Sequence, residues 1–141
     1  MKGVTFDLWQ TLLMDNRELG RARMQVRLDG ARKILHKIGE EFSEDQVRDA
    51  YRSCFRTCHD IREKEKDVAF ADQVGFFISY IDDGLMERIA GEEIQRITKI
   101  YADSFFEYPP VLHQDAIRVL ADIQDSGYRL GLISNTGMTP G

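Results

Sequence analysis

The chain begins with a short apolar segment that ends in a carboxylate. Residues Gly3 to Phe6 predict a short buried β-strand, and Asp7 follows at once. In open α/β sheets, ligands bind outside the carboxyl ends of the strands. Removing an ionised carboxylate from water is costly unless it is paired or bound to a metal. Asp7 is therefore the first candidate for a catalytic residue, and a parallel sheet is the expected setting.

A second segment near the other end of the chain has the same form. Residues 128–133 predict another strand, and Ser134 and Asn135 follow it. Two parallel strands would place Asp7 across a shared crevice from these small polar side chains. The alternative for all three residues is an ordinary turn or cap, because Asp, Ser and Asn are common turn residues.

The two segments resemble the first two motifs of the haloacid dehalogenase-like (HAD) hydrolases. The first motif is an apolar strand followed by Asp-x-Asp-Gly-Thr in phosphatases or Asp-x-Tyr-Gly-Thr in 2-haloacid dehalogenases, and residues 6–12 read Phe-Asp-Leu-Trp-Gln-Thr-Leu. The second is an apolar strand ending in Ser or Thr, often Ser-Asn, as in residues 132–135. The resemblance covers the whole chain. It implies an α/β fold with a HAD-like (Rossmann-like parallel sheet) core and an inserted α-helical cap.

The resemblance also implies a role for each matching residue. Asp7 would be the nucleophile, attacking phosphorus or a carbon that bears halide and forming an ester that water cleaves. Thr11, Ser134 and Asn135 would bind the anionic group of a small substrate. Asp7 would be a ligand of a Mg²⁺ cofactor, together with the backbone carbonyl of Trp9. The implied activity is hydrolysis of a small phosphorylated metabolite by the complete protein.

Two residues depart from the phosphatase motif. Trp9 stands where phosphatases carry an acid/base Asp, and an indole N–H cannot act as acid or base near neutral pH. An aromatic residue there resembles the dehalogenases, in which halide leaves without a proton, and it would contact the substrate. Packing under the cap is the alternative role of Trp9. Gln10 replaces the usual Gly, so an altered loop is expected after Asp7.

The third and fourth motifs of the family have no counterpart in this sequence. They are a Lys and an acidic pair that helps to hold magnesium, and both lie well beyond the second motif. We therefore expect the N-terminal part of a longer hydrolase, inactive alone and weak in binding Mg²⁺. The alternative is a non-catalytic, truncated HAD-like binding protein. Two strands leave open sheet edges, so a homodimer or a further C-terminal segment is expected to cover them.

Composition narrows the class of protein. The 141 residues, 43% of them hydrophobic, suffice for one compact domain or a domain with a small cap. A net charge of -5 argues against a nucleic-acid partner. No apolar run approaches the roughly 20 residues of a membrane span, and the start lacks the apolar core of a signal peptide. We expect a soluble, cytoplasmic protein with no membrane partner.

The region between the strands has a helical pattern throughout. We assign residues 1–14 and 109–141 to the partial core and residues 15–108 to the cap. A capping box at Ser43–Gln46 begins the strongest amphipathic helix, and its inner face includes Cys54 and Cys58 as small core residues. The remaining predicted helices contain Leu28, Ala31, Leu35 and Ile38 before Gly39; residues 68–86; residues 94–105 before Pro109-Pro110; and Ile117, Leu120 and Ala121 before Gly127.

Basic residues are concentrated in the first part of the predicted cap. The resemblance implies that one of them reaches an anionic substrate, whereas a solvated basic helix face is the alternative for each. The sequence does not choose among them. They are Arg17, Arg21, Arg23, Arg27, Arg32 and Lys33.

Overall fold

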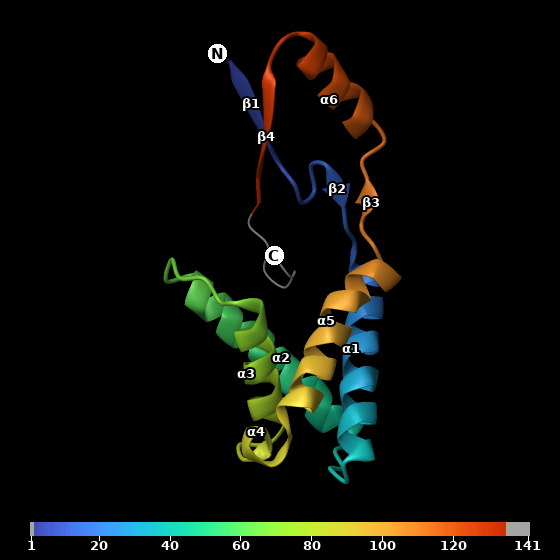
Figure 1. Cartoon of the computed structure of the whole chain (residues 1–141), viewed down its shortest axis with the longest axis vertical. Coiled ribbons are helices and arrows are strands. Elements are labelled where there is room, and N and C mark those ends of the chain that lie inside the picture. The colour runs from blue at the N-terminus through green and yellow to red at the C-terminus, as the bar shows by residue number, and fades with distance from the viewer. Residues whose placement is uncertain (1, 135–141) are drawn as a thin grey trace. The chain divides into compact units, whose positions relative to one another are not determined.

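The computed structural model describes residues 2–134 and is a mixed α/β structure, mostly helical, with two small sheets (Figure 1). Within these residues, no helix combines the length and apolar character that a membrane crossing requires. The elements in chain order are β1 (Gly3–Asp7), β2 (Leu13–Met14), α1 (Arg17–Lys37), α2 (Glu44–Arg62), α3 (Phe70–Ile81), α4 (Leu85–Arg88), α5 (Gly91–Glu107), β3 (Val111–Leu112), α6 (Ala116–Asp125) and β4 (Arg129–Ile133).

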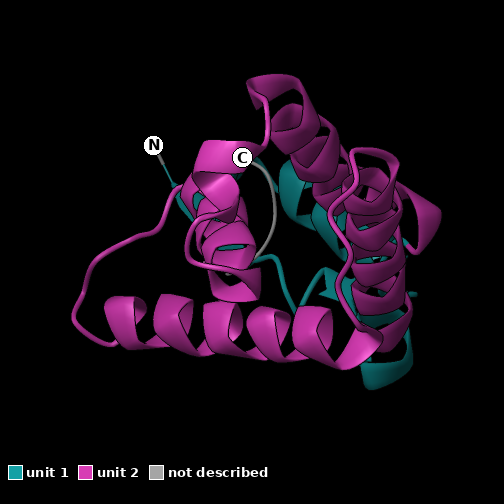
Figure 2. Ribbon diagram, turned by 90° about the horizontal axis from the view of Figure 1, so that it is seen from below, with its two compact units in different colours: residues 1–20, 109–136 teal, residues 21–108, 137–141 magenta. Residues whose placement is uncertain are grey.

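The chain divides into two compact units, coloured separately in Figure 2. The first, here called the strand unit, comprises residues 1–20 and 109–136. The second, the helical unit, comprises residues 21–108 and 137–141. All four strands and α6 belong to the strand unit, whereas α2 to α5 and most of α1 belong to the helical unit.

The strand unit contains the expected parallel pair. Strand β1 pairs with β4 from Gly3 opposite Arg129 to Asp7 opposite Ile133, which confirms the parallel arrangement of the two apolar segments. A second, antiparallel pair joins β2 to β3, and the His113 N–H donates to the Leu12 carbonyl beside it at 2.8 Å. This second pair was not predicted, because strands of two residues are too short to show a hydrophobic alternation.

The prediction that the first strand, β1, is buried was wrong. All five residues of β4 are exposed, and β1 alternates between exposed and half-buried positions. Ile117, one of the apolar residues on which the prediction of α6 rested, is 71% exposed. A sheet of two strands has too little cover for its faces and edges, so its apolar side chains stay accessible. Among the described residues of the strand unit, only Ala116 is a buried hydrophobic residue.

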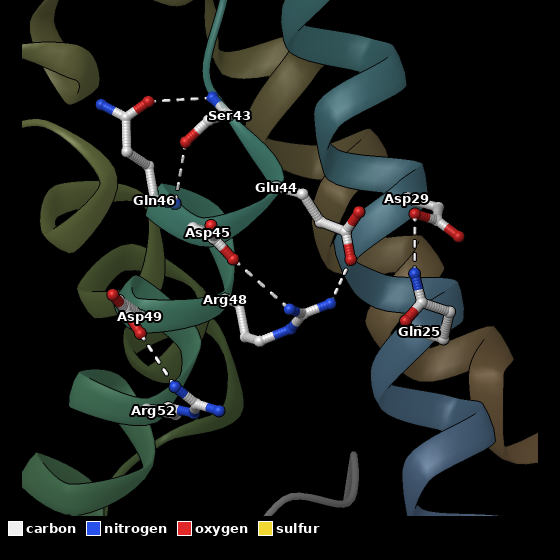
Figure 3. A network of polar contacts seen from close by, with 9 residues as sticks. All are labelled: Gln25, Asp29, Ser43, Glu44, Asp45, Gln46, Arg48, Asp49 and Arg52. Carbon is white, nitrogen blue, oxygen red and sulfur yellow. Dashed lines mark hydrogen bonds and ion pairs between the residues drawn. The ribbon is translucent and has the colours of Figure 1, made fainter.

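The core lies in the helical unit. Helix α2 buries Val47, Ala50, Cys54 and Cys58, as its amphipathic pattern predicted, whereas Phe55, predicted on the same face, is 55% exposed. The capping box is confirmed: the Gln46 N–H donates to the Ser43 hydroxyl at 3.1 Å, and the Ser43 N–H donates to the Gln46 side-chain oxygen at 2.8 Å (Figure 3). Core residues from the other helices include Leu28, Leu35, Val74, Phe77, Ile78, Leu85, Ile97 and Tyr101.

Glycine ends two of the helices as predicted. Gly39 has a φ of +85°, and the N–H of Glu40 donates to the Leu35 carbonyl at 3.0 Å, as in a Schellman motif. Gly127 ends α6 in the same way, with a φ of +81°. Ile38, predicted to share one helical face with Leu28, Ala31 and Leu35, lies outside α1. It follows the last helical residue and is 42% exposed, because the chain turns away at Gly39.

The single helix predicted over residues 68–86 is two helices. Helix α3 ends at Ile81, and Asp82 is extended, with a φ of -161°. The Asp82 carboxylate accepts a hydrogen bond from the Gly84 N–H at 3.1 Å, which stabilises a turn before α4. Helix α5 ends at Glu107, before the two prolines, as predicted.

We expect the exposed edge of β4 to make the chain self-associate. An apolar strand edge offers unpaired backbone groups to another chain, and Leu132 is 56% exposed. Leu132→Lys should weaken association at least about tenfold, because burying an unpaired ammonium costs more than the roughly 1.4 kcal/mol that this factor represents. Sedimentation velocity measures the effect. Gln124→Lys adds the same charge on α6 and serves as control; equal association of both variants would contradict the role of the edge.

Candidate functional site

Asp7 and Ser134 lie at the carboxyl ends of two paired strands. Asp7 is the last residue of β1 and pairs with Ile133, the last residue of β4, so Ser134 comes directly after the pair. Both Asp7 and Ser134 are exposed. The parallel register therefore brings the two residues to the same edge of the sheet, where ligands bind in open α/β sheets. Asn135 lies outside the described residues.

The carboxylate of Asp7 is held by the loop that follows it. Its Oδ1 accepts a hydrogen bond from the Leu8 N–H at 2.8 Å. The carbonyl of Leu8 in turn accepts from the N–H groups of Leu12 at 3.0 Å and Leu13 at 2.8 Å, which closes the loop. The described residues give Oδ2 no hydrogen-bond donor. One oxygen is thus oriented by the backbone, while the other keeps its lone pairs for a ligand.

Gln10 adopts a conformation that glycine takes most readily. Its φ is +58°, in the left-handed region, where a side chain is strained. Two hydrogen bonds stabilise it there: the Gln10 N–H donates to the Leu13 carbonyl at 2.8 Å, and the side-chain Nε2 donates to the Asp15 carbonyl at 3.0 Å. The replacement of Gly by Gln is therefore accommodated by a left-handed glutamine whose side chain adds a contact of its own.

Trp9 and Thr11 occupy different environments in the same loop. Trp9 is half-buried, and its backbone forms a bridge with Leu13. Thr11 is exposed, and no hydrogen bond in the described part of the chain joins it to Asp7 or Ser134. The structure therefore brings Asp7 and Ser134 to one edge of the sheet. It does not tie Thr11 to either of them.

Asp7 belongs to no cluster of metal-ligating side chains among the described residues. Mg²⁺ takes six oxygen ligands in near-octahedral geometry, usually with one or two carboxylates and several waters. Residues 2–134 contain no group of three or more His, Cys, Asp or Glu side chains placed to hold a metal ion. Asp7 is thus the one side-chain ligand that the resemblance implies, and the described residues add no cluster of ligands to it.

Comparison with known proteins adds no assignment. No family model, no curated protein and no solved structure matches this chain. The likeness to HAD hydrolases therefore rests on residues 6–12 and 132–135 and on their order in the sequence.

Two arginines of α1 that lie on the predicted basic face are buried. Arg23 is 5% exposed and Arg27 is 3% exposed, so a solvated face is the wrong description for both. Each lies four residues from the next inward position of the helix, in the series Arg23, Arg27, Ala31 and Leu35. That spacing was the available signal in the sequence, and the positive charge of the side chains obscured it.

Among the described residues, the hydrogen-bond and ring contacts of the Arg27 guanidinium are with neutral groups. Its Nε donates to the Ser104 hydroxyl at 2.9 Å and its Nη1 donates to the Tyr51 hydroxyl at 3.2 Å. The guanidinium lies 5.1 Å from the ring centre of Tyr101 and 5.2 Å from that of Phe105. In the described part of the chain, Nη2 has no hydrogen-bond partner. Burial raises the pKa of the Tyr101 hydroxyl well above its usual range, so Tyr101 does not neutralise Arg27.

The two cysteines are core residues, as predicted. Cys54 and Cys58 are free and buried, and the Cys54 thiol donates to the Gln73 carbonyl at 3.1 Å. Burial raises the pKa of Cys54 to about 12 and also raises the pKa of Cys58. Both thiols therefore stay protonated near neutral pH, which disfavours a nucleophilic role.

We expect Gln10→Gly to give a more stable protein than Gln10→Ala. Both changes remove the side-chain hydrogen bond to Asp15, so their difference isolates the left-handed backbone at this position. Gly should be favoured by about 1 kcal/mol in the free energy of unfolding. Trp9, the single tryptophan, lies in the same loop, so its fluorescence during denaturant titration reports the effect. Equal stability of the two variants would show that Gln10 is not left-handed.

Arg27→Ala and Arg27→Met should differ in their effects on stability. Alanine leaves a cavity among the rings and should cost about 2–4 kcal/mol of unfolding free energy. Methionine fills the space and removes the uncompensated charge, so it should cost less than about 1 kcal/mol or stabilise the protein. Denaturant unfolding followed by circular dichroism measures both. Arg21→Ala, on the exposed side of α1, should change stability by less than about 0.5 kcal/mol. Equal losses for Ala and Met would mean that the charge itself is needed.

Proposed function

We propose that this chain carries the nucleophile of a HAD-like hydrolase that acts on a small phosphorylated metabolite. The observation that supports this most is the register of β1 and β4, in which Asp7 ends one strand and Ser134 follows the other. Carboxylate and hydroxyl groups at such an edge are suited to acyl-phosphate chemistry on a small anion. The order of the two motifs along the chain supports the same assignment.

In the proposed reaction, Asp7 attacks through Oδ2. A bond forms between this oxygen and phosphorus, and the bond from phosphorus to the leaving alcohol oxygen breaks. Water then cleaves the aspartyl phosphate and restores the carboxylate. The Leu8 N–H holds Oδ1 at 2.8 Å and so orients the carboxylate for attack. Ser134 donates a hydrogen bond to a phosphoryl oxygen as its negative charge grows.

The leaving group decides between two substrate classes. A departing alkoxide needs a proton, and Trp9 cannot donate one at the position where phosphatases carry an acid. Solvent must then supply the proton. In the alternative reaction, Asp7 attacks a carbon that bears a halogen, and halide leaves with the bonding electrons and no proton. Trp9 favours this 2-haloacid reaction, whereas the general family resemblance favours phosphate esters.

A non-catalytic function is the alternative from another class. The exposed apolar residues of β4 favour a protein that binds a partner through this strand. Turnover by the purified protein would exclude it.

The first experiment is to isolate the protein from its native source, measure its intact mass against 16.3 kDa, and assay it. We expect hydrolysis of p-nitrophenyl phosphate or of 2-chloropropionate by the native form. Asp7→Asn should abolish the activity, because an amide oxygen is a poor nucleophile. Asp125→Asn changes an exposed carboxylate at the end of α6 and should leave it intact. Undiminished turnover by the Asp7 variant would refute the assignment, and the preferred substrate distinguishes the two reactions.

A further inference from the structure

A cleft of about 710 Å³ lies within the helical unit. Its walls are the last turns of α1, from Asp29 to His36, and residues 40–43 of the connection to α2. Pockets for small molecules commonly measure about 300–1,000 Å³. The cleft does not include Asp7, Trp9, Thr11 or Ser134.

The connection that forms one wall is fixed at several points. The Schellman motif at Gly39 sets its beginning, and the capping box at Ser43 sets its end. Between them, Glu40 accepts two hydrogen bonds from Arg88, at 2.7 and 3.1 Å, and Arg88 also donates to Asp82 at 2.8 Å. Phe42 packs against the core. The cleft is thus formed before any ligand binds, which lowers the entropic cost of binding.

The lining carries charges of both signs, but they are not equally engaged. Arg88 donates hydrogen bonds to Glu40, which lowers the pKa of that carboxyl. Arg32 and Lys33 make no ion pair within residues 2–134, and the Nε of Arg32 is buried there without a hydrogen-bond acceptor. Asp29 accepts a hydrogen bond from Gln25 at 2.9 Å, and Glu41 lies 3.6 Å from His36. Arg32 and Lys33 are therefore cations of the cleft without an ion-pair partner in this part of the chain, and Asp29 and Glu41 keep acceptor capacity beside them.

We propose that this cleft binds a small organic anion that carries hydroxyl groups. Arg32 and Lys33 hold the carboxylate or phosphate group, for which a guanidinium and an ammonium are strong donors. The carboxylates of Asp29 and Glu41 accept hydrogen bonds from the hydroxyl groups and reject a ligand that is anionic along its whole length. The mixed lining thus selects a ligand with one charged end and one neutral, hydroxylated end.

Glycerol 3-phosphate has this chemistry and serves as the probe. Titration into the ¹⁵N-labelled 141-residue chain should shift the amide resonances of residues 29–43, whereas glycerol should not. In the double variant R32Q/K33Q the dissociation constant should rise by about tenfold or more, the effect of losing charge-assisted hydrogen bonds. R56Q/K64Q removes two exposed cations of the same kinds outside the cleft and should bind as the parent does. Lys33→Arg should retain binding.

Three results would overturn the proposal. The first is an absence of shifts in residues 29–43 up to about 10 mM probe, above the range of ordinary metabolite sites. The second is unchanged affinity in R32Q/K33Q with its helical circular dichroism preserved. The third is loss of binding in Asp7→Asn, which would place the probe at the hydrolase site. Because the cleft does not depend on Asp7, failure of the proposed hydrolase activity leaves this site untouched.

Discussion

The pairing of β1 with β4 is the contact on which the candidate site depends, since it joins segments from near the two ends of the described chain. Closing such a long loop has an entropic cost that grows only slowly with its length. A short parallel pair can therefore offset this cost when other contacts contribute. In the strand unit these contacts are few, and β4 keeps its apolar residues exposed. The hydrophobic core is in the helical unit instead, where helices α1 to α5 all contribute to it.

Local features of the fold followed from the sequence because their causes are local. The capping box at Ser43, the glycine ends at Gly39 and Gly127 and the inner face of α2 each depend on residues close together in one segment. Burial did not follow in the same way. Ile117 lies on an apolar stripe and is exposed, whereas Arg27 carries a charge and is buried. Which side chain is buried depends on packing partners from other elements, and the sequence of a single segment does not identify those partners.

Arg27 shows how a charge is accommodated in such a core. Its long apolar stem packs like that of a hydrophobic residue, and hydroxyls and aromatic rings surround the guanidinium. These groups offer lone pairs and ring faces but no negative charge, so the desolvation of the cation is only partly offset. The aromatic residues of α5 are thus as important for this position as the spacing of residues along α1.

At the candidate site, the position of Asp7 was predictable and the shape of its loop was not. A carboxylate after an apolar strand marks the ligand edge of a sheet, but the left-handed Gln10 depends on hydrogen bonds to Leu13 and Asp15.

The loop after Asp7 also limits the chemistry. In the proposed hydrolase it presents one carboxylate oxygen for attack and, through Trp9, no proton donor for the departing group. A nucleophile without a partner acid works best on bonds whose leaving group is stable as an anion. Halide, or the oxygen of an acidic alcohol, meets that condition; the alkoxide of a simple alcohol does not. Trp9, two residues after Asp7, therefore restricts the substrates of the proposed hydrolase more than the nucleophile itself does.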